Sequence, residues 1–249
     1  MATFRDHFSS QAMNYQKYRP GYPDELFSYL CSLCYDKKYA WDSGTGNGQC
    51  ALELTRYFDK ILATDPSESQ IKGATQQTQI KYDVSLAEKC PESDQSFDLI
   101  TVAQALHWFD FNAFFKEVKR VSKQGGIFAA WTYTHAEVSP DVDLIYSKFY
   151  SDIVGKYWPE ERKFVENKYK SIIFPFEDIE SPNFKIKIKY SRADYLAYLG
   201  TWSAVKNYKL DNQNDPIELI ESEIAEVWED KEELREVKWP IHLGVGRMN

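Results

Sequence analysis

Three glycines on alternate residues, Gly44, Gly46 and Gly48, constrain this chain more than any other feature. A short apolar run that ends in the acid Asp42 comes directly before them, and a helical pattern begins directly after them. This order predicts a strand, a tight turn and the start of a helix. Because glycine has no Cβ, such a turn lets a ligand approach the backbone closely. The loop therefore indicates a nucleotide-like cofactor.

The spacing of this loop favours one class of cofactor over another. The fingerprint of dinucleotide-binding proteins reads G-x-G-x-x-G and requires glycine at position 49, where this chain has Gln49. The observed G-x-G-x-G, with an acid two residues before it, resembles the first motif of class I S-adenosylmethionine-dependent methyltransferases. Two other hypotheses stay open: an oxidoreductase that binds nicotinamide or another nucleotide, and a cofactor-binding protein without catalysis.

Length and charge limit the kind of protein further. The 249 residues suffice for one large α/β domain with an insertion, or for two small domains. The net charge of −8 argues against a broad surface for nucleic acid or anionic membranes. The sequence has neither an apolar run of membrane-spanning length nor an apolar signal core at its start. We expect a cytoplasmic protein with a small-molecule substrate, and the sequence does not specify its oligomeric state.

The cysteines raise the question of a metal or redox site. Cys31 and Cys34 form a C-x-x-C pair, a spacing that occurs in both kinds of site. Both lie on the apolar stripe of an expected helix, and no second C-x-x-C supplies the other half of a zinc site. We therefore expect buried thiols and no bound metal.

Apolar runs of strand length alternate with amphipathic stretches between residues 39 and 131. This alternation predicts an α/β fold with a doubly wound, seven-stranded, mostly parallel sheet. The expected strands cover residues 39–42, 61–64, 80–84, 97–103 and 127–131. The expected helices cover residues 23–34, 48–58 and 111–121, with another that starts near Ser67.

The pattern changes after residue 134, where helical stretches follow one another without a strand. We interpret residues 135–183 as a helical cap inserted into the α/β domain. Residues 1–134 then hold the N-terminal segment and the cofactor-binding part, and residues 184–249 hold the C-terminal part of the same domain. The elements expected after residue 134 are helices over 142–153, 164–172, 192–199 and 216–228, a strand over 184–190 and a final antiparallel strand over 236–243.

An acid is expected at the end of the second strand, about 20 residues beyond the glycine loop. Asp65 stands there. Its carboxylate can accept hydrogen bonds from both hydroxyls of a cofactor ribose. The alternative is that Asp65-Pro66-Ser67 serves only to cap the following helix.

Four further stretches resemble small-molecule methyltransferases similar to trans-aconitate methyltransferase. The motifs are A-E-x-x-P-x-x-D-x-S-F-D-L from residue 87, Q-A-x-H-W-F-D over 104–110, Y-x-x-x-R-P-x-Y-P over 15–23, and the endings T-W-S and W-P-x-x-L from residues 201 and 239. The resemblance is strong over residues 4–134 and weak over 184–249, and the cap carries no signature of the family. It implies a Rossmann-like class I fold and the cofactor S-adenosyl-L-methionine.

The loop, the acid and this resemblance together predict which residues bind the cofactor and which bind the substrate. The predicted cofactor-binding residues are Tyr18, Asp42, Gly44, Thr45, Gly46, Asp65, Pro66, Ala87, Glu88, Ala103 and Gln104. The predicted substrate-binding residues are Arg19, Trp108, Trp131, Tyr133 and Trp202.

Methyl transfer from a sulfonium needs positioning and desolvation more than activation, because the methyl group is already reactive. Aromatic faces near the sulfonium would help through cation–π attraction. Tyr15, Tyr18, Trp108 and Phe109 are the candidates, with ordinary core packing as the alternative.

His107 is the candidate catalytic residue. With a pKa near the reference value of about 6.5 it could take a proton from a hydroxyl or amine, and otherwise it positions a carboxylate or caps the next helix. Arg19 could hold a substrate carboxylate or could simply be solvated. The resemblance favours methylation of a carboxylic acid to give a methyl ester. The alternative within enzymes is O- or N-methylation of another small metabolite with His107 as base.

Overall fold

A computed structural model describes residues 18–249 of the chain. The predicted aromatic role of Tyr15, and the start of the motif that contains it, lie outside the described residues. The strands are β1 (Tyr39–Ser43), β2 (Lys60–Asp65), β3 (Ile80–Val84), β4 (Phe97–Ala103), β5 (Ser122–Tyr133), β6 (Glu177–Asp178), β7 (Phe184–Tyr190) and β8 (Arg235–Arg247). The helices are α2 (Asp24–Ser32), α3 (Gln49–Leu54), α4 (Glu68–Lys72), α5 (Phe111–Val121), α6 (Pro140–Lys148), α7 (Arg162–Glu166), α8 (Arg192–Gly200), α9 (Ser203–Asn212) and α10 (Glu221–Val227).

The strands form one eight-stranded sheet in the order β3-β2-β1-β4-β5-β8-β6, with β7 also paired to β8. Strands β1 to β5 are parallel, and β8 runs antiparallel to β5, β6 and β7. The predicted α/β class, the mostly parallel sheet and the antiparallel last strand are confirmed. The sheet has eight strands and not seven because the two-residue strand β6 pairs with the end of β8.

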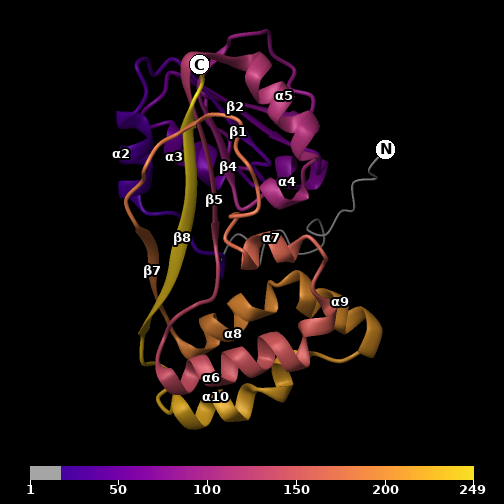
Figure 1. The fold of residues 1–249 in the computed structure, drawn as a ribbon. Coiled ribbons are helices and arrows are strands. Elements are labelled where there is room, and N and C mark those ends of the chain that lie inside the picture. Colours follow the sequence, from indigo (N-terminus) through magenta and orange to yellow (C-terminus); the bar gives the residue numbers. More distant parts are fainter. Residues whose placement is uncertain (1–17) are drawn as a thin grey trace.

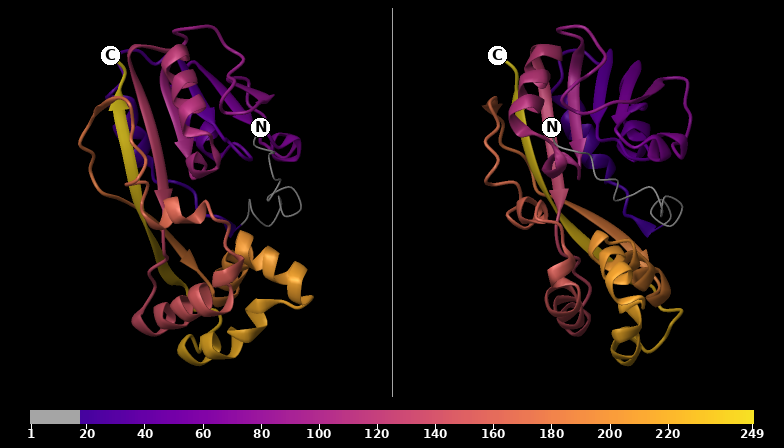
Figure 2. Two further views of the ribbon diagram at one scale, coloured as in Figure 1. Left: turned by 45° about the vertical axis from the view of Figure 1, so that its right-hand side comes forward. Right: turned by 90° about the vertical axis from the view of Figure 1, so that its right-hand side faces the viewer.

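Strand β8 connects the parallel part of the sheet with the helical layer. Its residues 241–247 pair with β5, whereas residues 235–241 pair with β7 at the other end. Figure 1 shows β7 and β8 running from the sheet toward a separate layer that holds α6, α8, α9 and α10. The two turned views show the same layer at the end of the long strands (Figure 2).

Two apolar layers cover the two faces of the sheet, because successive side chains of a strand point to opposite faces. Trp41 and Ile100 belong to one layer, and Ala40 and Leu99 belong to the other. The second layer continues without a break into the helical part, where Phe149 is fully buried. The helical layer is therefore packed on the sheet by a shared core.

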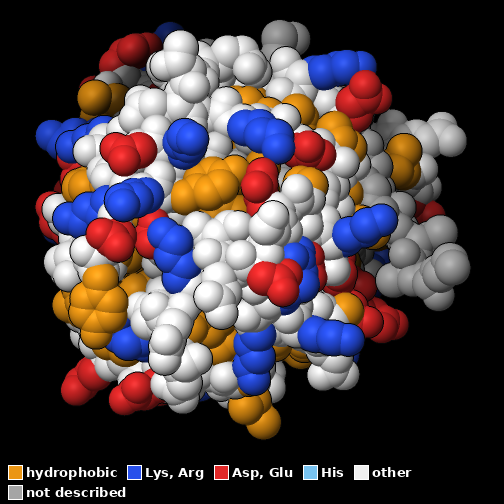
Figure 3. All heavy atoms as spheres, turned by 90° about the horizontal axis from the view of Figure 1, so that it is seen from above, with side chains coloured by type: hydrophobic (Ala, Val, Ile, Leu, Met, Phe, Trp, Pro, Cys, Tyr) orange, Lys and Arg blue, Asp and Glu red, His pale blue; other side chains and the backbone are white. Residues whose placement is uncertain are grey.

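The helical layer contains segments that come before β7 in the sequence and segments that come after it. Helix α10 packs against α6 and α8, so segments before and after β7 meet in one layer. The division of the chain at residues 134 and 183 stays a prediction. From above, the opposite end of the molecule shows Lys, Arg, Asp and Glu side chains intermixed over one face (Figure 3). Over the described residues, no helix combines the length and the apolar character needed to cross a bilayer.

The helix expected over residues 48–58 is shorter, since α3 ends at Leu54, and the α-helical part of the one expected over 142–153 ends at Lys148. Two further differences have clear reasons. Helix α9 was not predicted because its mainly polar sequence buries only Ala204 and Val205. The helix expected over residues 164–172 ends early, since α7 stops at Glu166 and Lys168 and Tyr169 take positive φ angles of 60° and 59°. Left-handed residues of this kind end a helix.

Candidate active site

Two adjoining cavities lie where the carboxyl ends of the parallel strands meet, which is the usual ligand site of an open α/β sheet. The large cavity, of about 970 Å³, is bordered by the glycine loop, Asp65 and Glu88. The small cavity, of about 50 Å³, is bordered by His107, Arg19 and Arg162. Residues that border both are Arg19, Gln104, Trp108, Tyr133, Trp158 and Pro159.

The large cavity gathers most of the residues predicted to bind the cofactor. Those that line it are Gly44, Thr45, Gly46, Asp65, Pro66, Ala87, Glu88, Ala103 and Gln104. Of the predicted set, Tyr18 and Asp42 are not among the lining residues. Tyr18 is held through its carbonyl, which accepts a hydrogen bond of 2.6 Å from the hydroxyl of Tyr190.

Asp42 lies beneath the glycine loop and is fully buried. The hydroxyl of Thr45 donates to its Oδ2 at 2.5 Å, and the hydroxyl of Thr101 donates to its Oδ1 at 2.9 Å. Burial raises the pKa of Asp42, and these donors oppose the rise. The carboxyl group therefore fastens the loop to strand β4 from behind the cavity.

The three glycines of the loop have different roles. Gly44 has a φ of +69°, and a Cβ there would lie 2.6 Å from the Cβ of Ala105. At Gly48 a Cβ would collide with the hydroxyl of Tyr82. At Gly46, with a φ of +56°, the nearest atom to such a Cβ is Oε1 of Gln70 at 4.0 Å. Close packing of the protein thus requires glycine at 44 and 48, whereas Gly46 faces open space beside the cavity.

Asp65 does two things at the end of β2. Its Oδ2 accepts a hydrogen bond from the backbone N–H of Gly46 at 2.9 Å, and its Oδ1 accepts one from Ser67 N–H at 2.9 Å. Ser67 is itself the N-cap of α4. The expected helix-cap role is therefore present, but the carboxylate also ties the loop to β2 and borders the large cavity. A carboxylate has acceptor capacity beyond two hydrogen bonds, so a ribose can share this group.

Two polar side chains of the large cavity were not predicted. Asn47 and Gln70 are 6% and 3% exposed, and within the described part of the chain neither Asn47 Nδ2 nor Gln70 Oε1 has a hydrogen-bond partner. A buried donor and a buried acceptor beside one cavity fit a polar cofactor that supplies their missing partners. The sequence did hold a signal for each of them: Asn47 lies inside the glycine loop, and Gln70 lies in the first helical turn after Asp65.

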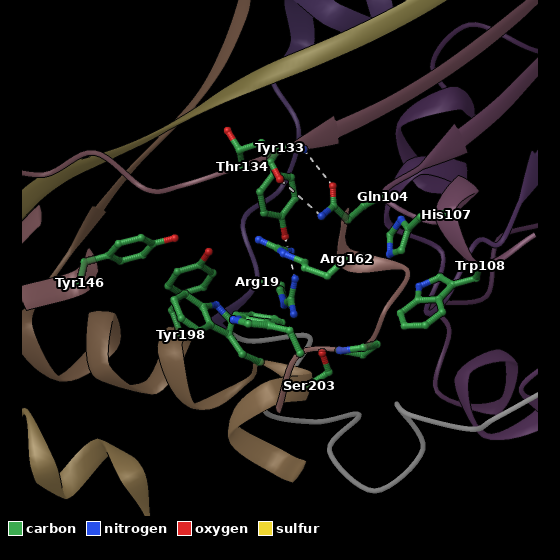
Figure 4. A pocket seen from close by; sticks show the side chains of 13 residues that line it. Arg19, Gln104, His107, Trp108, Tyr133, Thr134, Tyr146, Arg162, Tyr198 and Ser203 are labelled. Atoms are coloured by element: carbon green, nitrogen blue, oxygen red, sulfur yellow. Dashed lines mark hydrogen bonds between the residues drawn. The ribbon is translucent and has the colours of Figure 1, made fainter. Parts of the chain in front are cut away.

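The small cavity has aromatic walls and basic groups. Side chains that line it are Arg19, Gln104, His107, Trp108, Tyr133, Thr134, Tyr146, Trp158, Arg162, Tyr198, Trp202 and Ser203. Figure 4 shows the two guanidinium groups among these side chains. None of the described residues that line this cavity is an Asp or a Glu. The predicted substrate residues Arg19, Trp108, Tyr133 and Trp202 are brought together here.

Trp131 is the predicted substrate residue that the structure places elsewhere. It is fully buried and lines neither cavity. Its ring makes edge-on contacts with Tyr22 and Phe27, at centroid distances of 5.3 and 6.3 Å. This position supports packing of α2 and the preceding segment on strand β5.

Arg19 and Gln104 build the wall between the cavities. Arg19 donates from Nη1 to the hydroxyl of Tyr133 at 2.9 Å and from Nε to the hydroxyl of Thr201 at 3.1 Å. Gln104 has a φ of +56°, and its Oε1 accepts from the backbone N–H of Tyr133 at 2.9 Å and from Thr132 Oγ1 at 2.8 Å. These bonds fix both side chains at the shared boundary (Figure 4).

His107 borders the small cavity from the 3₁₀ turn Leu106–Trp108 that follows β4. The side chain is 7% exposed, and its Nδ1 lies 2.9 Å from the hydroxyl of Tyr169. Burial, assisted by the charge of Arg162, lowers the pKa of His107 to about 3. The expected pKa of about 6.5 is corrected accordingly. With this low pKa the imidazole is neutral at physiological pH and is a weak base. It is poorly suited to general-base catalysis, because a general base works best with a pKa near the operating pH.

The cap supplies residues that the sequence could not assign. Tyr146, Trp158 and Arg162 line the small cavity, whereas Phe149 belongs to the core. Aromatic content was the available signal for the first two, and it did not separate packing from a ligand site. Arg162 carried no signal, since the other residues of its cavity, such as Arg19 and His107, come from segments far apart in the sequence.

The fold, the glycine loop and the acid at the end of β2 define a class I methyltransferase architecture. Comparisons with known proteins agree. Residues 41–130 match the family described as methyltransferase domain. A candidate methyltransferase of Dictyostelium discoideum is 31% identical over 247 residues, covering 96% of this chain and 94% of that protein. A candidate S-adenosylmethionine-dependent methyltransferase of Saccharomyces cerevisiae is 24% identical over 242 residues, covering 83% of each.

A solved structure extends the agreement to three dimensions. A candidate type II methyltransferase from Anaeromyxobacter dehalogenans has a TM-score of 0.86 and 37% identity, covering 92% of this chain and 97% of that one. The chain therefore belongs to the class I S-adenosylmethionine-dependent methyltransferases. It is an enzyme whose cofactor is S-adenosyl-L-methionine. The narrower resemblance to trans-aconitate methyltransferase stays a prediction.

Proposed function

We propose that this methyltransferase transfers its methyl group to a carboxylate of a small organic acid, giving a methyl ester. One observation carries the proposal: the small cavity has two guanidinium groups, from Arg19 and Arg162, and no Asp or Glu among its described lining residues. A cavity of this charge attracts an anionic group and disfavours an ammonium group.

We assign S-adenosylmethionine to the large cavity. Asp65 would hold the ribose, Gly46 would allow close approach of the cofactor, and Asn47 and Gln70 would supply a donor and an acceptor. When bound, the cofactor supplies an activated methyl group on a sulfonium. Trp108 borders both cavities and so lies where donor and acceptor meet. Its aromatic face can stabilise a nearby cation.

The proposed reaction needs no proton transfer. A carboxylate oxygen forms a bond to the methyl carbon as the carbon–sulfur bond breaks, and that electron pair stays on sulfur. A carboxylate is already ionised at neutral pH, because its reference pKa is about 4. The low pKa of His107 suits this reaction, since a hydroxyl or amine acceptor would instead require a competent base. In our proposal His107, which contacts the hydroxyl of Tyr169, forms part of the wall of the small cavity.

The stability of the product to alkali tests the proposal. The enzyme is incubated with methyl-labelled S-adenosylmethionine and a panel of aliphatic and aromatic acids, alongside the corresponding amides. We expect labelled product from acids and not from amides, and release of labelled methanol on brief treatment with alkali. Label that survives alkali would indicate an ether or an N-methyl product and would support the alternative of O- or N-methylation, with His107 as the base.

A matched variant separates enzyme turnover from background methylation in this assay. Gly46→Val leaves the small cavity unchanged and blocks the large one, so the variant should give no labelled product from any acid. Labelled product formed equally by this variant would mean that the signal does not come from the proposed site.

A further inference from the structure

Arg162 stands at the start of α7 and reaches into the small cavity from the cap. Its guanidinium lies over the ring of Trp158 at 4.5 Å and near the ring of Tyr150 at 5.5 Å. Its Nε donates to the hydroxyl of Tyr150 at 2.9 Å, and that hydroxyl donates to Glu166 at 2.6 Å. Stacking and one hydrogen bond therefore fix the plane of the guanidinium group.

The two arginines of the small cavity are used differently by the protein. Arg19 donates to Tyr133 and Thr201 and so joins the N-terminal segment to β5 and to the corner between α8 and α9. Arg162 makes only the bond to Tyr150, and among the described residues it forms no ion pair and its two terminal nitrogens donate no hydrogen bond. Glu166 is linked to Arg162 only through the hydroxyl of Tyr150, so the half-buried guanidinium group makes no direct ion pair with the described residues and can take an anionic ligand.

We infer that Arg162 is the residue that binds the carboxylate of the acceptor, and that it sets the preference of this enzyme for acids over neutral analogues. The inference rests on the proposed function and goes beyond it by naming the anchor. The planar fork of an arginine matches a carboxylate, and its fixed plane directs the free nitrogens to one place. Trp158, which supports this plane, borders both cavities, so the anchored carboxylate lies beside the cofactor.

The same anchor explains how the product leaves. The acceptor carries a negative charge before transfer and none afterwards, because an ester is neutral. The charge-assisted hydrogen bonds to Arg162 are therefore lost in the reaction that they prepare. An acid should bind to this enzyme more tightly than its own methyl ester, and the difference should depend on Arg162.

The test measures binding of benzoate, benzamide and methyl benzoate to the full chain saturated with S-adenosylhomocysteine, by ligand-observed NMR titration. The three probes share one aromatic body and differ in charge. In the wild type we expect benzoate to bind at least about tenfold more tightly than the two neutral probes, since hydrogen bonds between two charged groups are stronger than those to a neutral group. Arg162→Gln should remove this preference, and Arg162→Lys should restore part of it.

Lys163→Gln is the matched control, because it removes the same charge at the next residue from an exposed side chain that lines neither cavity. It should leave the preference for benzoate unchanged. Arg162→Met keeps an unbranched side chain over Trp158 and replaces Arg162→Gln should the latter not fold, as judged by its melting temperature and its binding of S-adenosylhomocysteine.

Three outcomes would overturn the inference: a wild type that binds benzoate no better than benzamide, an Arg162→Gln protein that keeps the preference, or a Lys163→Gln protein that loses it. Failure of the proposed function is recognised separately, because it appears as alkali-stable product in the labelling assay. An enzyme that prefers benzoate through Arg162 but makes alkali-stable product would have an anionic acceptor that is methylated at another atom.

Discussion

The two cavities of this active site are built differently. Most residues that line the large cavity lie at the ends of β1, β2 and β4, and the N-terminal segment and residues 158–161 complete it. Part of its shape comes from the left-handed backbone of Gly44 and Gly46. The small cavity is formed by side chains from the N-terminal segment, the turn after β4, β5, the cap and the α8–α9 corner. From this comparison we infer that the sheet and its loops prepare the place of the cofactor, whereas side chains of the helical layer contribute to the choice of acceptor.

The two cavities also differ in charge. Acidic side chains border the large cavity, among them Asp65, Glu88 and Glu161. Such groups suit a cofactor that carries a sulfonium and an amino group. The small cavity has cationic side chains and aromatic walls. In the reaction that we propose, a cationic donor lies beside an anionic acceptor, and the sulfonium and carboxylate charges vanish together when the methyl group moves.

The largest expected effect is the loss of cofactor binding at the large cavity, with the small cavity left intact. Gly46→Val places a branched side chain in the space beside the large cavity, so binding of S-adenosylhomocysteine should weaken more than about a hundredfold. Gly44→Val should instead destabilise the fold by about 2–5 kcal/mol, because its Cβ meets Ala105 and its φ is left-handed. Calorimetric titration and urea unfolding separate the two losses. Normal binding by a folded Gly46→Val protein would remove the loop from the site.

The next largest effect tests the role of Asp65, which also borders the large cavity. Asp65→Asn removes the charge and keeps an acceptor for only one of the two N–H groups of Gly46 and Ser67, because an amide has a single oxygen. Affinity for S-adenosylhomocysteine should fall by about 10- to 100-fold. Asp65→Ala is a poorer test, since it also releases the loop. Calorimetry measures the affinity, with thermal unfolding as the control. An unchanged affinity in Asp65→Asn would mean that the ribose lies elsewhere.

The large cavity could be predicted from the sequence much better than the small one. Asp65 and the glycines were predictable because a strand end, a tight turn and an acid at a set distance are local requirements. Gln104 also lies where expected, directly after β4, and its φ of +56° marks a constrained turn. The α/β class and the mostly parallel sheet were predictable because strands alternate with helices along the chain.

The acceptor side could not be predicted in this way. A tryptophan at a strand end looks the same in the sequence whether it faces a cavity or the core, and the structure places Trp131 in the core. Arg162 becomes informative only when Trp158 and Tyr150 are seen to hold its plane. Helix α9 has no apolar stripe to reveal it, yet it begins at Ser203, which lines the small cavity. Contacts between distant segments decide the positions of Trp131 and α9, and the cavity that Arg162 enters is also lined by distant segments.

A smaller effect concerns the neutral imidazole on the acceptor side. The folded pKa of His107 is about 3 and the unfolded value is about 6.5, so between these values the unfolded chain binds more protons than the folded one. Stability should therefore fall as the pH falls from about 6.5 toward 3, by up to about 1.4 kcal/mol per pH unit from this residue. Urea unfolding of wild type and His107→Gln at pH 7, 6, 5 and 4 measures the slope.

The control for this slope is His242, whose pKa is also lowered by burial, to about 4, and which lies outside both cavities. His242→Gln should leave the contribution of His107 in place. A His107→Gln protein with the slope of the wild type would mean that the imidazole is not held neutral by the fold.

The smallest expected effect decides between the two enzyme mechanisms. With a pKa of about 3, His107 is neutral throughout pH 6–9, so the rate should be nearly flat over this range whether or not the imidazole acts as a base. The pH profile alone therefore cannot separate the mechanisms, but the variant can. For a carboxylate acceptor, His107→Gln should change kcat by less than about threefold, because no proton is transferred, whereas loss of a general base costs about 10²–10⁴-fold. Steady-state kinetics with the acid found in the labelling assay gives the answer, and a loss of a hundredfold or more in kcat with unchanged KM would place the imidazole in the chemical step.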